Sequence, residues 1–149
     1  MQILKSISPH IDIAEIGFPH STPIGDGPQI QTSSYRSIKN GFKMRDIFQM
    51  VKIYKKSSRS KPIILMGYYN MIFQYNENKF LNDCKKARVN GIICVDLPWP
   101  ENKNFANKCK KRSINFIQLL SPTTSKDRMK KIVKASHDMI YYISMLSTT

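Results

Sequence analysis

The chain has 149 residues, 41% of them hydrophobic, which suffices to bury the core of a single domain over residues 1–149. The 24 lysines and arginines outnumber the 10 acidic residues and give a formal net charge of +14. Because the basic residues recur as pairs in expected helices and form no aromatic–basic platform, we expect neither nucleic acid nor a membrane as partner. Three cysteines without C-x-x-C spacing, and no stretch near the roughly 18 apolar residues of a membrane span, exclude a disulfide framework, a zinc site and a membrane protein, and predict a cytoplasmic location.

The first distinctive segment is residues 14–31, AEIGFPHSTPIGDGPQIQ. A strand over Ile11–Ile16 is expected to deliver Glu15 into a loop rich in proline and glycine, and this loop holds a second carboxylate, Asp26. Such a loop is too irregular for a helix and holds its polar side chains in fixed directions. Two acids so placed indicate an active site. The stretch from about 30 to 56 predicts one or two helices, broken near Asn40-Gly41.

From residue 62 onward, short apolar runs alternate with polar segments that are compatible with helices. Continuously apolar runs are typical of parallel strands buried on both faces. Strands are expected over Ile63–Met66, Gly91–Val95, Asn115–Leu120 and Met139–Ser144, and helices over 77–88, 100–112 and 125–136. The pattern therefore predicts an α/β fold of about five parallel strands with crossover helices. Taken alone, it fits either an open doubly wound sheet or part of a closed eight-stranded barrel.

Several motifs in order resemble the tryptophan synthase α subunit family. The similar segments are residues 14–31, PIILMGYYNMIF (62–73), GIICVDLPWPE (91–101), FIQLLSPTTSKDRMKKI (116–132) and IYYIS (140–144). The resemblance implies a partial (β/α)8 TIM barrel that starts just before the family's second strand and stops after the sixth. A whole barrel needs about 250 residues. The first strand and the last two would be missing, and two strand edges would be left unpaired.

The resemblance also implies an activity, that of a lyase in tryptophan biosynthesis, which cleaves indole-3-glycerol phosphate to indole and glyceraldehyde 3-phosphate. Glu15 matches the family's catalytic glutamate, and its apolar neighbours favour the protonated form that a general acid needs. Asp26 matches the second acid, whose carboxylate accepts the indole N–H and stabilises positive charge on the ring. Positions matching the family's substrate pocket or loops are Tyr68, Asp96, Pro98, Tyr141 and Thr149. For the two tyrosines, core packing stays an open alternative.

The family's partner is a β subunit that carries pyridoxal phosphate, so the resemblance implies no cofactor for this chain and a heterotetramer of two α and two β subunits. Residues 18–28 and 68–75 would dock on that partner. Thr22 replaces an aspartate of this loop and cannot make the same charge-assisted contacts. Residues 145–147, Met-Leu-Ser, replace a basic and glycine-containing stretch of a mobile loop.

The short length supports an alternative, a truncated and catalytically inactive remnant that at most binds a β subunit. His10, His20 and His137 show no metal-ligand spacing, so we expect surface or packing roles for them and no metal.

Overall fold

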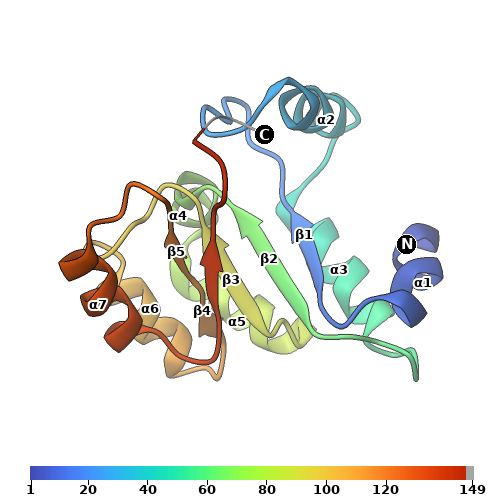
Figure 1. Cartoon of the computed structure of the whole chain (residues 1–149). Helices are drawn as coiled ribbons and strands as arrows, with labels where there is room; N and C mark the ends of the chain where they lie inside the picture. The colour runs from blue at the N-terminus through green and yellow to red at the C-terminus, as the bar shows by residue number, and fades with distance from the viewer. Residues whose placement is uncertain (147–149) are drawn as a thin grey trace.

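The computed structural model of the chain describes residues 1–146 and contains parallel strands flanked by helices (Figure 1). One sheet has the order β1 (Ala14–Gly17), β2 (Ile63–Gly67), β3 (Gly91–Cys94) and β4 (Asn115–Phe116), all parallel, and β5 (Gln118–Leu120) pairs in parallel with β6 (Ile140–Tyr142). Only Ile117 separates β4 from β5, and its N–H donates to the Ile92 carbonyl of β3 (2.9 Å). β4 and β5 are therefore two parts of one strand, interrupted at Ile117, and this strand joins the two sheets.

The helices follow the strands in alternation, as the βα rhythm of the sequence predicts. They are α1 (Gln2–Ile7) with a 3-10 turn η1 (Ser8–His10), α2 (Pro28–Lys39), α3 (Met44–Tyr54), α4 (Tyr69–Tyr75), α5 (Glu77–Ala87), α6 (Lys103–Lys110) and α7 (Lys126–Ala135). Figure 1 shows α3, α5 and α6 behind the sheet, whereas α2 lies beyond the carboxyl ends of the strands. No helix within residues 1–146 is both long and apolar enough to cross a membrane.

The main core lies between the outer face of the sheet and the helices. On α3, the buried residues Met44, Ile47, Phe48, Val51 and Tyr54 recur at intervals of three or four, which places them on one side of the helix. Alternate strand residues meet them from the sheet, because successive side chains of a strand point to opposite faces. This packing orders the strands and so fixes where each strand ends.

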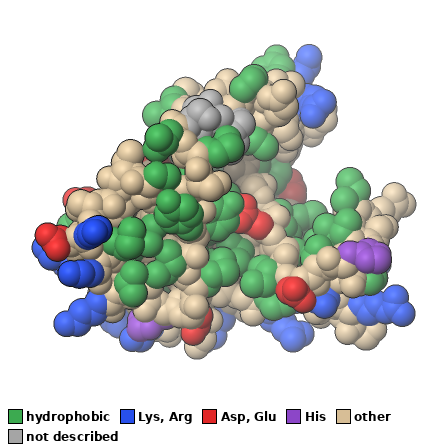
Figure 2. Space-filling model, viewed as in Figure 1, with side chains coloured by type: hydrophobic (Ala, Val, Ile, Leu, Met, Phe, Trp, Pro, Cys, Tyr) green, Lys and Arg blue, Asp and Glu red, His purple; other side chains and the backbone are tan. Residues whose placement is uncertain are grey.

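The inner face of the sheet is also apolar, but it carries no layer of helices. Ile64, Ile93 and Ile117 form a second buried cluster, and Met66, Val95, Leu119, Met139 and Tyr141 pack against it. Figure 2 shows hydrophobic side chains gathered over the strands on this face. Apolar side chains on both faces explain why these strands form continuous apolar runs in the sequence.

Several boundaries differ from the sequence prediction for local reasons. β1 begins at Ala14, three residues later than expected, because its first partner on β2 is Ile63 and residue 62 is a proline without an N–H. The strand expected over Asn115–Leu120 is divided at Ile117. α4 lies in a segment to which the sequence analysis assigns no helix, and it forms because Ile72 is fully buried against the core. The expected break at Asn40-Gly41 is confirmed, with Gly41 at φ +80°.

Candidate active site at the carboxyl ends of the strands

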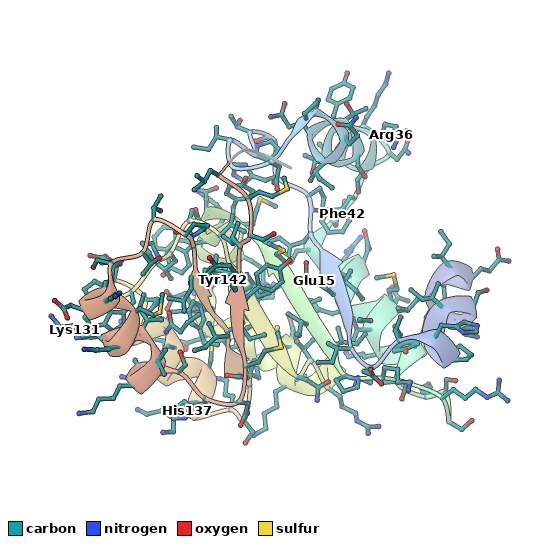
Figure 3. All side chains as sticks on the ribbon, viewed as in Figure 1. Glu15, Arg36, Phe42, Lys131, His137 and Tyr142 are labelled. Carbon is teal, nitrogen blue, oxygen red and sulfur yellow. The ribbon has the colours of Figure 1, made fainter. Side chains whose placement is uncertain are left out.

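Glu15 lies on β1, on the face opposite the helices. Its neighbours Ala14 and Ile16 pack into the main core, so the alternation of the strand turns Glu15 to the inner face, in register with Ile64 of β2. Figure 3 labels Glu15 on β1 among the strands. Among residues 1–146, β2 is the one strand that pairs with β1, so the Glu15 side chain is exposed. Partial burial by the surrounding sheet still raises the pKa of the carboxyl above its ordinary value. A glutamate with a raised pKa is suited to carry a proton.

The loop after β1 is fixed at its base by the sheet. The Phe18 N–H donates to the Met66 carbonyl of β2 (2.9 Å), and the Phe18 ring fills the space beside Gly67, where an added Cβ would lie 2.2 Å from a ring carbon. Further along, the Asp26 N–H donates to the Pro23 carbonyl (3.0 Å), closing a turn. α2 then begins at Pro28, whose ring suits the first helical position. The turn and the start of α2 place Asp26 beyond the carboxyl ends of the strands.

Asp26 is bound by Tyr68, the residue that follows β2. The Tyr68 hydroxyl donates to Asp26 Oδ2 (3.0 Å) and accepts the Gly25 N–H (2.9 Å), and the ring stacks on His20 with centroids 4.8 Å apart. Burial, with the acceptor Asp26 as a further cause, raises the pKa of Tyr68 to about 12. The phenol therefore remains a donor at neutral pH. The structure thus joins two predicted site residues that are 42 positions apart.

Asp96 follows β3 on the same edge of the sheet. Its Oδ1 accepts the backbone N–H of Tyr69 (2.7 Å), so the aspartate connects the loop after β3 to the start of α4. Partial burial raises the pKa of Asp96, and its own backbone N–H and the nearby His20 oppose this with smaller effects. Asp96 is therefore held next to the Tyr68 and His20 pair by the parallel arrangement of β2 and β3.

Pro98 and Tyr141 lie in different surroundings. Pro98 is exposed and lines a cavity of about 230 Å³ between the loop after β3 and α7. Tyr141 of β6 is partly buried and packs against the inner cluster, so the packing alternative describes its contacts. Thr149 is outside the residues that the structure describes.

Glu15 and Asp26 are not joined by a hydrogen bond. Instead, Asp26 lines a hollow of about 310 Å³ together with Gly17 and Met66, which pair with each other two residues beyond the Glu15 and Ile64 pair in the register of β1 with β2. One acid therefore comes from the inner face of the strand and the other from the loop above it. This arrangement can combine proton transfer by Glu15 with charge stabilisation by Asp26.

His20 is a site residue that the sequence analysis places only at the surface or in packing. Its ring stacks on Tyr68, and its Nδ1 accepts the Thr22 N–H (3.0 Å). The available signal is its position in the same proline- and glycine-rich loop as Asp26. Among residues 1–146 no group of three or more histidine, cysteine or acidic side chains could hold a metal ion.

Comparison with known proteins places the chain in a family. A family model described as "Tryptophan synthase alpha chain" matches residues 1–149. Proteins of that name from Pelagibacter ubique and Thermococcus kodakarensis are 68% and 36% identical over the whole of this chain, which covers 56% and 59% of their lengths. The chain thus spans little more than half the length of these relatives.

Solved structures agree with this comparison. A tryptophan synthase complex from Pyrococcus furiosus matches at 38% identity and a TM-score of 0.88, over 93% of this chain and 57% of that one. A mutant tryptophan synthase α subunit from the same organism matches at 37% and 0.90, over 97% and 59%. Because these neighbours are TIM barrels, the fold is part of a (β/α)8 barrel and not a doubly wound sheet. With the family model covering every residue, the chain belongs to the tryptophan synthase alpha chain family.

Proposed function

We propose that this chain acts in tryptophan biosynthesis as a carbon–carbon lyase that cleaves indole-3-glycerol phosphate to indole and glyceraldehyde 3-phosphate. Family membership supports the proposal, and the observation that carries it is the fixed carboxylate of Asp26. Tyr68 holds this carboxylate beside the hollow that Gly17 and Met66 line, two residues along the strands from the Glu15 and Ile64 pair. Both acids lie at the carboxyl ends of parallel strands, where barrel enzymes carry their catalytic residues.

The proposed reaction needs one proton added and one removed. Glu15 delivers a proton to C3 of the indole ring, and the ring takes up positive charge. The Glu15 carboxylate so formed then accepts the proton of the hydroxyl on the side-chain carbon attached to C3. That carbon becomes the aldehyde carbon of glyceraldehyde 3-phosphate, and the electron pair of the breaking carbon–carbon bond returns to the ring, which leaves as neutral indole. The raised pKa of Glu15 favours the protonated starting form. Asp26 accepts the indole N–H and stabilises the positive ring.

The proposed partner is a tryptophan synthase β subunit, which supplies pyridoxal phosphate, so the chain itself needs no cofactor. The similar structure from Pyrococcus furiosus is a tryptophan synthase complex. Residues 18–28 and 68–75 are the proposed docking segments. Each contains a strongly exposed apolar side chain, Ile24 at 79% and Phe73 at 64% exposure. A partner that covers these two side chains would remove apolar surface from water, which favours docking there. We propose two α and two β subunits in the complex.

The test is indole release from indole-3-glycerol phosphate by the purified chain, with and without a β subunit, alongside circular dichroism to verify folding. Glu15→Gln should abolish cleavage because the amide cannot carry the proton, while Glu101→Gln, an exposed glutamate outside the proposed pair, should leave it unchanged. Retained activity in Glu15→Gln would remove this residue from its role. A folded chain that releases no indole would favour the inactive remnant that at most binds a β subunit.

A further inference from the structure

The loop between β3 and α6, residues 95–102, carries two of the proposed substrate-binding residues, Asp96 and Pro98, without any helix or strand of its own. A loop that presents binding residues must be held by its surroundings, because its own backbone bonds do not fix its direction. One attachment is the bond from the Tyr69 N–H to Asp96 described above. Two further attachments come from residues to which the proposed function gives no role.

The inner attachment is Asn102, whose side chain is almost fully buried at 1% exposure. Its Nδ2 donates both to the Leu97 carbonyl inside the loop (3.2 Å) and to Oε1 of Gln118 on β5 (2.8 Å). Gln118 is also buried, at 3% exposure. Since buried amides are costly to leave unpaired, this pair fixes the middle of the loop relative to β5.

The outer attachment is Arg128 on α7. Its guanidinium donates to the Trp99 carbonyl and lies over the Trp99 ring, 5.8 Å from the ring centroid. Lys103 Nζ lies 5.1 Å from the same centroid. The indole N–H of Trp99 is buried and has no acceptor among the described residues, so no hydrogen bond of its own directs the ring. Packing and the two cations hold it instead.

We infer that Asn102 and Arg128 are positioning residues that together clamp the loop 95–102 and thereby orient Asp96 and Pro98 toward the substrate. The inference rests on the proposed function for its substrate. Neither residue acts on the reacting atoms. Loss of either attachment leaves Asp96 and Pro98 present but displaced, and this weakens ground-state and transition-state binding alike.

The clamp itself is measured without substrate, through the fluorescence of Trp99, the one tryptophan of the chain. Arg128→Ala should raise the acrylamide quenching constant, because the ring loses the side chain that covers it, and Arg128→Lys should restore part of the protection. Lys130→Ala, which removes another exposed cation of the same helix, is the matched control and should leave quenching unchanged. Equal quenching in Arg128→Ala and Lys130→Ala would overturn the inference.

The positioning role is measured by steady-state kinetics of indole release. Arg128→Ala and Asn102→Ala should each raise KM by about three- to tenfold with kcat changed by less than about twofold, the signature of lost uniform binding. Asn104→Ala, an exposed asparagine on α6, controls for Asn102, and Arg128→Ala keeps the test valid if Asn102→Ala fails to fold. Quenching that changes while KM stays constant would overturn the inference. A wild type that makes no indole, yet shows the Arg128-specific quenching, would refute the proposed function and still support the clamp.

Discussion

Replacing Tyr68 by phenylalanine tests whether Asp26 must be held in place. The change removes one oxygen, and with it the bond to Asp26 Oδ2 (3.0 Å) and the acceptor of the Gly25 N–H (2.9 Å), while the ring can still stack on His20. A hydrogen bond to a charged group contributes about 1.5–3 kcal/mol. Because Asp26 is only half-buried, we expect the lower end of this range.

The expected result is a fall of roughly tenfold in kcat/KM, since about 1.4 kcal/mol corresponds to a factor of ten. The loss should lie mainly in kcat, because Asp26 is proposed to stabilise charge that develops in the transition state. Unfolding in urea should also show a loss of about 1–2 kcal/mol, because the bond to Asp26 and the bond from the Gly25 N–H are both lost at a partly exposed site. Tyr35→Phe, an exposed tyrosine on α2 with no hydrogen bond from its hydroxyl to any described residue, is the control. A kcat/KM within about twofold of the parent would refute the reasoning that Tyr68 orients Asp26.

Two further changes test the base of the site and the charge of Glu15. Gly67→Ala should destabilise the chain by about 1–3 kcal/mol in urea, because its Cβ would overlap the Phe18 ring. Gly17→Ala, where an added Cβ meets nothing within 4 Å, should change stability far less, and equal effects would contradict the packing argument. Because partial burial raises the pKa of Glu15 above its ordinary 4.5, the unfolded chain loses this proton first as pH rises. Ionisation of Glu15 therefore destabilises the folded parent once the pH exceeds the ordinary pKa of glutamate. Glu15→Gln should be more stable than the parent near neutrality and equal to it in acid. A stability difference that does not depend on pH would exclude the ionisation of Glu15 as its cause.

The strands of the fold could be predicted because each is apolar on both faces. β2 and β3 lie within a residue of their expected bounds, since Ile63–Gly67 and Gly91–Cys94 pack against helices on one side and the inner cluster on the other. α4 could not be predicted, because a seven-residue aromatic segment has too few turns for a clear period. It is packing of Ile72 in the folded core that makes it helical.

The site could be predicted only in part. Parallel strands bring their carboxyl ends to one edge, so a sequence that places Glu15, Tyr68 and Asp96 at or after strand ends already indicates a shared site. The individual contacts depend on loop conformation, which no spacing encodes. The bond between Tyr68 and Asp26 needs the turn at Pro23, and the role of Arg128 needs α7 to lie beside the loop 95–102.

The environment of Glu15 links the fold to the proposed chemistry. In a closed eight-stranded barrel every strand has two neighbours, whereas within the described part of this chain β1 has a single partner strand, β2, and Glu15 is exposed. Desolvation is the cause of its raised pKa, so an apolar element that covers the free edge of β1 would raise that pKa further. Covering the edge would also place the carboxyl group deeper in the inner face, among Ile64 and its neighbours. The same contact that completes the sheet would therefore strengthen the protonated form on which general acid catalysis depends.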